Sequence, residues 1–197
     1  HVVPIPGLGD GNIFTPDDVI AGAAITGPVV VFDDDHYYMG GVIAESLRAK
    51  GHEVTLVTPM AEASAWTVYT LELGRIQKRL IEAGIKILGS HTLSGIGGSE
   101  AEVACVHTGR IRGLASASIV LVTGQDPDNA LYKELTDDPG AMAAAGIRRV
   151  TMIGDALAPG TIAAAIWSGH RFARELGETL PDGPSYRYEF PALAEPI

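Results

Sequence analysis

The sequence predicts an α/β fold in which a Rossmann-like open parallel sheet is accompanied by a small antiparallel β element. Three observations predict it. Short apolar runs alternate with helically spaced apolar residues, glycines end several of these segments, and one later stretch alternates without helical spacing. The chain has 197 residues, of which 46% are hydrophobic, so it is long enough to bury one sizeable core or two smaller ones.

The parallel sheet is predicted from a β-α-β-α-β order. Residues 29–32 form a continuous apolar run, typical of a strand that is covered on both faces. Helical spacing follows and ends at Gly51, and residues 53–57 form the next strand. A second helix ends at Gly84, directly before a strand at residues 85–88. Such an order predicts parallel strands that are joined by right-handed crossovers.

The flanking regions are less regular. Residues 1–27 are rich in proline and glycine and are predicted to form a connector, with one short helix from Thr15 to Ala21. The alternation between residues 101 and 123 predicts antiparallel strands. We further expect a helix near residues 130–135, a strand at residues 150–153, a helix over residues 161–176 and an extended tail from residue 181.

Composition excludes several functional classes. The formal net charge of -10 repels phosphate backbones and anionic membrane surfaces, so we expect neither a nucleic acid nor a membrane partner. No apolar run approaches the roughly 20 residues that a bilayer requires, and no signal peptide is evident, which favours the cytoplasm. The sequence opens on His1 rather than Met, so we expect processing, tag cleavage or excision from a longer chain.

Cysteine and histidine usage predicts no metal site in this chain. Cys105 is the one cysteine, which excludes an intrachain disulfide and a four-cysteine iron-sulfur cluster. Its alternating context favours a buried structural thiol. The six histidines are scattered, and no motif for nucleophilic catalysis is present. We therefore predict no catalytic residue within these 197 positions.

The turn after the first predicted strand is acidic. It carries Asp33, Asp34 and Asp35, where a dinucleotide site has a glycine fingerprint that lets the backbone approach pyrophosphate. Carboxylates place negative charge and bulk there, at a cost of several kcal/mol if they are desolvated. The second strand ends at Thr58, where an NAD site usually offers Asp or Glu to the ribose. Both halves of the fingerprint are missing.

Three interpretations of this acidic turn are open. The first is a divalent-cation site, as in response-regulator receiver domains. Against it, Ser90-His91-Thr92 follow the third predicted strand, where a receiver has its phospho-accepting Asp. The second is a solvated acidic turn that caps the following helix. Alternatively, it is a degenerate nucleotide loop that was retained from an ancestor.

A family resemblance favours the degenerate loop. It is carried by residues 29–58, by residues 66–72 with Arg75 and Arg79, and by residues 153–176. Together these segments resemble the trimethylamine and dimethylamine dehydrogenase family, which belongs to the wider NADH:flavin oxidoreductases related to old yellow enzyme. The resemblance covers most of the chain. Its amine dehydrogenase branch likewise lacks a glycine fingerprint at this turn.

The resemblance implies a domain of the FAD/NAD(P)-binding type and a fragment of a larger enzyme. Its expected parts are a connector with the end of a flavin-type domain segment (1–27), an inserted NAD-type Rossmann-like domain with a degenerate fingerprint (28–124), the C-terminal part of the flavin-type domain (125–180) and a tail (181–197). A barrel that carries FMN and a 4Fe-4S cluster, together with the main glycine fingerprint, is expected before His1.

Five residues are candidate cofactor-binding positions. Thr123 and Gly124 end one predicted strand, and Gly154 and Asp155 follow another. The resemblance implies that Asp155 accepts hydrogen bonds from the hydroxyls of a bound ADP or FAD-like nucleotide, and that the helix starting near Thr161 points its amides at the same ligand. From the residues alone, a Gly-Asp turn with an Asp N-cap has equal weight.

The leading hypothesis is a portion of a flavin-dependent oxidoreductase resembling the amine dehydrogenases. The resemblance implies oxidative demethylation or deamination of a small amine, with electrons passing to an electron-transferring flavoprotein. The fragment alone is expected to be inactive, with the barrel domain of the same enzyme as its partner, and a homo-oligomer is left open. The alternative is a free-standing nucleotide-binding or receiver-like regulatory module without enzymatic activity.

Overall fold

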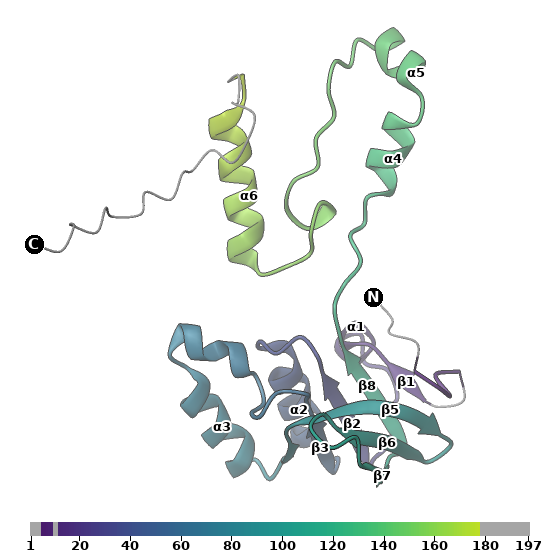
Figure 1. The fold of residues 1–197 in the computed structure, drawn as a ribbon, viewed down its shortest axis with the longest axis vertical. Coiled ribbons are helices and arrows are strands. Elements are labelled where there is room, and N and C mark those ends of the chain that lie inside the picture. The colour runs from purple at the N-terminus through teal and green to yellow at the C-terminus, as the bar shows by residue number, and fades with distance from the viewer. Residues whose placement is uncertain (1–4, 10–11, 178–197) are drawn as a thin grey trace, which may run out of the picture. The chain divides into compact units, whose positions relative to one another are not determined.

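The computed structural model describes residues 5–9 and 12–177. The chain divides into two compact units, residues 1–124 and residues 125–197 (Figure 1). Each unit is described by itself. Unit 1 contains both sheets of the described chain, and unit 2 contains helices joined by irregular segments. The predicted tail from residue 181 lies outside the described residues.

Unit 1 is built on a five-stranded parallel sheet of order β1-β8-β2-β3-β4. Its strands are β1 (Ile13–Phe14), β2 (Val29–Asp33), β3 (Val54–Val57), β4 (Lys86–Leu88) and β8 (Ser118–Val122). The central strand β2 pairs with β3 through Val30↔Thr55 and with β8 through Val30↔Ile119. All five residues of β2 are buried, as expected for a strand covered on both faces.

Helices cover one face of this sheet. They are α1 (Pro16–Ile20), α2 (Met39–Ala49) and α3 (Leu73–Glu82), and the 3₁₀ helix η1 (Ala65–Thr70) precedes α3. Leu47 of α2 and Leu80 of α3 are fully buried against Val31 and Leu56 of the sheet. The predicted helix from Thr15 is confirmed, because Thr15 caps α1 in a reciprocal capping box with Asp18.

A three-stranded antiparallel sheet, β5-β6-β7, covers the opposite face. Its strands are β5 (His91–Gly97), β6 (Glu100–Cys105) and β7 (Ile111–Ala115). Leu93 and Val103 from this sheet bury against Val30 and Phe32 of β2. Unit 1 therefore has three layers, with helices, parallel sheet and antiparallel sheet in that order (Figure 1).

Two strand predictions in unit 1 differ from the structure. Residues 101–123 were expected to be antiparallel throughout, but β8 pairs in parallel with both β1 and β2. The antiparallel sheet instead gains β5, whose Gly95 and Gly97 weaken the strand signal in the sequence. Residues 13–20, within the expected connector, form β1 and α1, and β1 is an edge strand of the parallel sheet.

Unit 2 contains α4 (Ala130–Thr136), α5 (Pro139–Ala144), the 3₁₀ helix η2 (Gly154–Ala156) and α6 (Ile162–Glu175). No residue from 125 to 177 is buried. The strand predicted at residues 150–153 is wrong, since this segment is irregular and pairs with no strand of the described chain. A strand needs a neighbour to satisfy its backbone, and the described part of unit 2 offers none. No helix of the described chain has the length and apolarity needed to cross a membrane.

Candidate functional site

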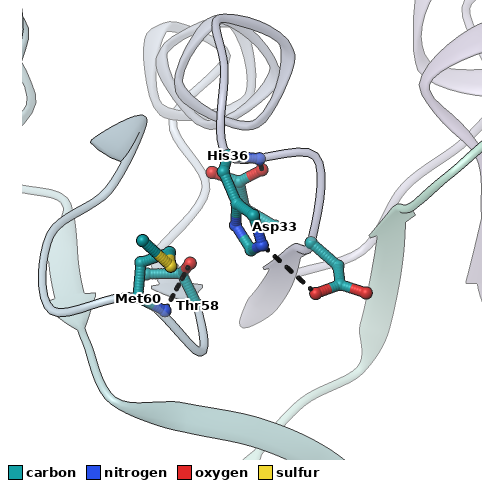
Figure 2. Close-up of polar contacts among 5 residues, drawn as sticks. Asp33, His36, Thr58 and Met60 are labelled. Carbon is teal, nitrogen blue, oxygen red and sulfur yellow. Dashed lines mark hydrogen bonds and ion pairs between the residues drawn. The ribbon is translucent and has the colours of Figure 1, made fainter. Parts of the chain in front are cut away.

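The candidate site lies at the carboxyl edge of the parallel sheet. The strand order reverses at β2, because β8 lies on one side of it and β3 on the other. In open α/β sheets, ligands bind beyond the carboxyl ends of the strands at such a switch point. The loops that follow β2 and β3 therefore form the candidate site (Figure 2).

Asp33 is the last residue of β2, and it is completely buried. Its Oδ1 accepts a hydrogen bond from the His36 backbone N–H at 3.1 Å. Its Oδ2 is buried without a hydrogen-bond partner. Burial raises the pKa of Asp33 from 3.8 to about 6, although the N–H and the charge of His36 act in the opposite direction. Asp33 is thus a desolvated carboxyl group whose protonation changes in the mildly acidic range.

Asp33 occupies the space beside the first turn of α2. A Cβ placed on Gly40, the second residue of that helix, would lie 2.4 Å from Asp33 Cγ. Only glycine leaves room for this carboxyl group. The N-cap residue Tyr38 makes no side-chain capping bond, so α2 begins without a conventional acidic cap. The carboxyl group therefore lies where a dinucleotide fold brings a pyrophosphate to the helix N-terminus.

His36 continues the acidic loop in a left-handed backbone conformation, with φ of 63°. Its Nε2 lies 3.5 Å from Asp34 Oδ1, and its ring meets the Trp66 ring edge-on at a centroid distance of 5.6 Å. Its Nδ1 is buried without a hydrogen-bond partner. The carbonyl oxygen of His36 also accepts a bond from the Trp66 N–H at 2.9 Å. These contacts join the loop after β2 to the loop after β3.

The loop after β3 supplies no carboxylate at the ribose position. Thr58 is fully buried, and its Oγ1 accepts a bond from the Met60 N–H at 3.3 Å (Figure 2). Ser64 is also buried and left-handed, with φ of 53°, and its Oγ has no hydrogen-bond partner. A Cβ on Gly41 would lie 3.2 Å from that oxygen. Both glycines at the start of α2 therefore allow a polar side chain to pack against the helix.

This arrangement tests the interpretations of the acidic turn. Asp33 is completely buried and no side chain caps α2, so the solvated capping turn is wrong for this residue. Within the described chain, no group of three or more His, Cys, Asp or Glu residues is placed to hold a metal ion, which gives the receiver-like cation site no support. Neither Ser64 nor the backbone strain at His36 carried a signal in the sequence that identifies this cluster.

The predicted nucleotide-binding residues are divided between the two units. Thr123 and Gly124 follow β8 at the end of unit 1. Gly154, Asp155 and Thr161 lie together in unit 2. The structure brings the last three to one turn and the helix that follows it.

Thr161, rather than Asp155, caps α6. The Thr161 hydroxyl accepts a bond from the Ala164 N–H at 3.3 Å. Asp155 is exposed, and its Oδ1 accepts a bond from the Gly160 N–H at 3.3 Å. Gly154 is left-handed, with φ of 59°, and its N–H donates to Ser168 Oγ at 3.0 Å. The alternative of an Asp N-cap is therefore wrong, and Asp155 keeps an exposed carboxylate that is able to accept hydroxyl donors.

Cys105 is half-buried rather than buried, since it ends β6 at a hairpin turn. The Thr108 hydroxyl, then the N–H groups of His107 and Thr108 and the charge of Arg110, lower the pKa of this thiol. The alternating context predicted a buried thiol, but it did not reveal that the strand ends at Cys105 itself.

The fold and the site together define a class, namely an α/β domain whose usual ligand edge is filled by its own acidic loop. A family model described as the OYE-like second alpha/beta domain matches residues 14–117. The chain belongs to this family, whose relatives are flavoprotein oxidoreductases of the trimethylamine and dimethylamine dehydrogenase type. The resemblance found in the sequence is confirmed.

Individual relatives agree with the family. The chain is 32% identical over 199 residues to dimethylamine dehydrogenase of Hyphomicrobium sp. (strain x), covering 90% of this chain and 27% of that protein. The solved structure of histamine dehydrogenase from Rhizobium sp. 4-9 has 40% identity and a TM-score of 0.86, over 94% of this chain and 29% of that one. A 6-hydroxypseudooxynicotine amine oxidase from Pseudomonas geniculata N1 has 36% identity and a TM-score of 0.82, over 90% and 26%. The chain thus spans less than a third of each relative.

Proposed function

We propose that this chain is the carboxyl-terminal, nucleotide-fold portion of a flavin-dependent amine oxidoreductase, and that unit 1 takes no pyridine nucleotide. The longer protein, called here the parent enzyme, oxidises a small amine by demethylation or deamination in the cytoplasm. The observation that carries the proposal is the buried Asp33 carboxyl group beside the first turn of α2.

Electrostatics oppose a pyrophosphate at this edge. Above its pKa of about 6, Asp33 adds a negative charge at the helix N-terminus, and Asp34 and Asp35 follow it. Two like charges 4 Å apart repel by about 4 kcal/mol at an effective dielectric of 20. His36 and Ser64 lie beside the carboxyl group in left-handed conformations, and Asp33 has no exposed surface. We infer that NADH and NADPH do not reduce the parent enzyme through unit 1.

Unit 2 is proposed to be part of a flavin-type domain that the parent enzyme completes. No residue from 125 to 177 is buried, and the apolar side chains of Ile162 and Ile166 are 80% and 65% exposed. A domain needs a core of its own, so these surfaces require further chain.

The residues of unit 2 fit a nucleotide with free hydroxyl groups, such as ADP or an FAD-like ligand. Asp155 offers an exposed carboxylate, and Gly154 has no side chain to obstruct an approach. Helix α6 begins at Ile162, seven residues after Asp155, and its first turn is capped by Thr161. We propose that these residues of unit 2 hold the ligand by hydroxyl and phosphate contacts. Thr123 and Gly124, at the end of unit 1, stay predicted nucleotide-binding positions.

The redox groups of the parent enzyme are proposed to lie outside this chain. One cysteine cannot ligate a 4Fe-4S cluster, which needs four thiolates. A preceding barrel would therefore carry FMN and the cluster, and electrons would leave to an electron-transferring flavoprotein. The relatives named as amine dehydrogenases or as an amine oxidase, at 32% to 40% identity, support an amine as the substrate.

An anaerobic titration of the parent enzyme tests this function. Small amines such as dimethylamine or histamine should bleach the flavin absorbance, and NADH and NADPH should leave it unchanged. Flavin reduction by micromolar NADH would contradict the proposal for unit 1. Reduction by NADH with no response to any amine would contradict the proposed substrate class as well.

A further inference from the structure

A cavity lies at one end of the antiparallel sheet, away from the acidic loop in sequence. Its volume is about 320 Å³. It is lined by His91, Cys105, Thr108, Arg110 and Arg112, and is called here the arginine pocket. None of these residues takes part in the proposed nucleotide sites.

The hairpin between β6 and β7 fixes one wall of the arginine pocket. The Cys105 N–H donates to the Arg110 carbonyl at 3.0 Å, and the Gly109 N–H donates to the Cys105 carbonyl at 2.8 Å. Gly109 adopts φ of 68°, which closes the turn in a conformation that favours glycine. The Arg110 N–H also donates to Thr108 Oγ1 at 3.3 Å. The backbone of this wall is thus held by its own hydrogen bonds.

The start of β5 fixes the other wall and ties it to the carboxyl edge of the parallel sheet. The His91 N–H donates to the Thr58 carbonyl at 3.0 Å, and the Val106 N–H donates to the Ser90 carbonyl at 2.9 Å. The His91 Nδ1 lies 2.7 Å from the Gly89 carbonyl oxygen, which accepts a proton rather than offering one. This bond assigns the proton to Nδ1 and leaves Nε2 for another partner.

The lining of the arginine pocket consists largely of hydrogen-bond donors and has no carboxylate. Among the described residues, neither Arg110 nor Arg112 forms an ion pair, whereas Arg79 pairs with Glu45 and Lys86 with Glu53. In a chain with a net charge of -10, two unpaired arginines on one cavity form a local positive site. Two arginines without a neighbouring carboxylate suit an anionic ligand, and arginine forks match phosphate oxygens.

We propose that the arginine pocket binds a phosphate group. Arg110 and Arg112 supply charge-assisted hydrogen bonds, and the Thr108 hydroxyl is able to donate a further one. The cavity is larger than one oxyanion, so the group is either free orthophosphate or the phosphate of a nucleotide such as AMP. The inference concerns this surface alone and does not depend on the reaction of the parent enzyme.

Cys105 provides a reporter inside the pocket. It is the one cysteine of the chain, and Thr108 and Arg110 lower its thiol pKa, so a neutral alkylating agent should modify it readily near neutral pH. A bound phosphate would block access to the sulfur and oppose the thiolate by its negative charge. The alkylation rate at Cys105 therefore measures occupancy directly.

The test measures iodoacetamide alkylation of Cys105 in the full-length protein, read by mass spectrometry at the peptide that contains this residue. Orthophosphate, or AMP, should slow alkylation by about fivefold relative to chloride at equal ionic strength. Protection by AMP at a lower concentration than orthophosphate would indicate a nucleotide as the source. Equal potency would indicate the free ion. Equal rates in phosphate, AMP and chloride would overturn the proposal.

Two arginine variants separate a site from a general charge effect. Arg112→Gln removes a pocket arginine that does not contribute to the lowered pKa of Cys105, and it should weaken phosphate protection by about tenfold. Arg75→Gln makes the same charge change at an exposed position of α3 outside the pocket. It should retain full protection. Equal loss in both variants would also overturn the proposal, and calorimetric titration with orthophosphate checks both results without the thiol.

Discussion

Units 1 and 2 bury their apolar residues very differently. In unit 1, two clusters pack on the two faces of the parallel sheet, and Val31, Leu56 and Leu80 have no exposed surface. In unit 2, α6 has a comparable apolar spacing, yet Ile162 and Ile166 are mostly exposed. A helix of this kind is stabilised by a sheet in unit 1, whereas the described part of unit 2 has no sheet to cover α6. Amphipathic pattern alone therefore does not make a domain.

The largest expected effect contrasts the cores of the two units. Leu80→Ala removes a fully buried side chain of α3 and should lower the free energy of unfolding by about 2–5 kcal/mol. Ile166→Ala, at 65% exposure in α6, should change it by less than about 0.5 kcal/mol in the 197-residue chain. Urea unfolding followed by circular dichroism measures both. An equal loss in the two variants would show that unit 2 has a core of its own.

The next effect tests the close approach of Asp33 to α2. Gly40→Ala places a Cβ against the buried carboxyl group and should destabilise unit 1 by about 2–3 kcal/mol. Gly74→Ala is the matched control, because Gly74 is likewise the second residue of its helix and has open space around it. That change should stabilise by about 0.5–1 kcal/mol.

Combining the Gly40 change with Asp33→Gly sharpens this result. If steric conflict between the two residues is the cause, the cost of Gly40→Ala should fall by more than half when the carboxyl group is absent. Thermal unfolding of the two single variants and the double variant gives the coupling energy. Simple additivity of the two changes would contradict the contact.

A smaller, pH-dependent effect follows from the raised pKa of Asp33. The folded state holds this proton up to about pH 6, whereas the unfolded chain releases it near 3.8. The stabilising contribution of the neutral form is thus complete below pH 4 and is lost as the pH rises through 6. At pH 7.5, Asp33→Asn should be more stable than the original chain by roughly 2 kcal/mol.

The two proteins should converge near pH 4, where both side chains are neutral. Chemical denaturation at several pH values between 4 and 8 measures the difference. A difference that stays constant across this range would mean that Asp33 titrates at its ordinary value in the folded state.

The sequence predicted most of unit 1 because its signals are local. The apolar run of β2 and the spacing of α3 depend on their own residues, and both elements form where expected. The direction of β8 was predicted wrongly, because an apolar run does not specify which strand it will join. The prediction of a strand at residues 150–153 was wrong for a related reason, since strand formation requires a neighbour that the described chain does not supply.

The position of the candidate site could be predicted from the sequence, but its three-dimensional arrangement could not. The missing glycine fingerprint at Asp33 and the family resemblance were both readable, and the comparisons confirm the family. The burial of Asp33 was not readable, because it depends on space beside Gly40 and on Ser64 from a different loop. Contacts between residues that are far apart in the sequence leave no periodic signal.

The central claim is that unit 2 is completed by the parent enzyme, and hydrogen exchange tests it most directly. The account predicts that amides of residues 150–176 exchange within seconds in the 197-residue chain, while β2 and β8 stay protected. In the parent enzyme, the same amides should be protected as strongly as those of β2. Equal protection of residues 150–176 in both proteins, or rapid exchange in both, would contradict the claim.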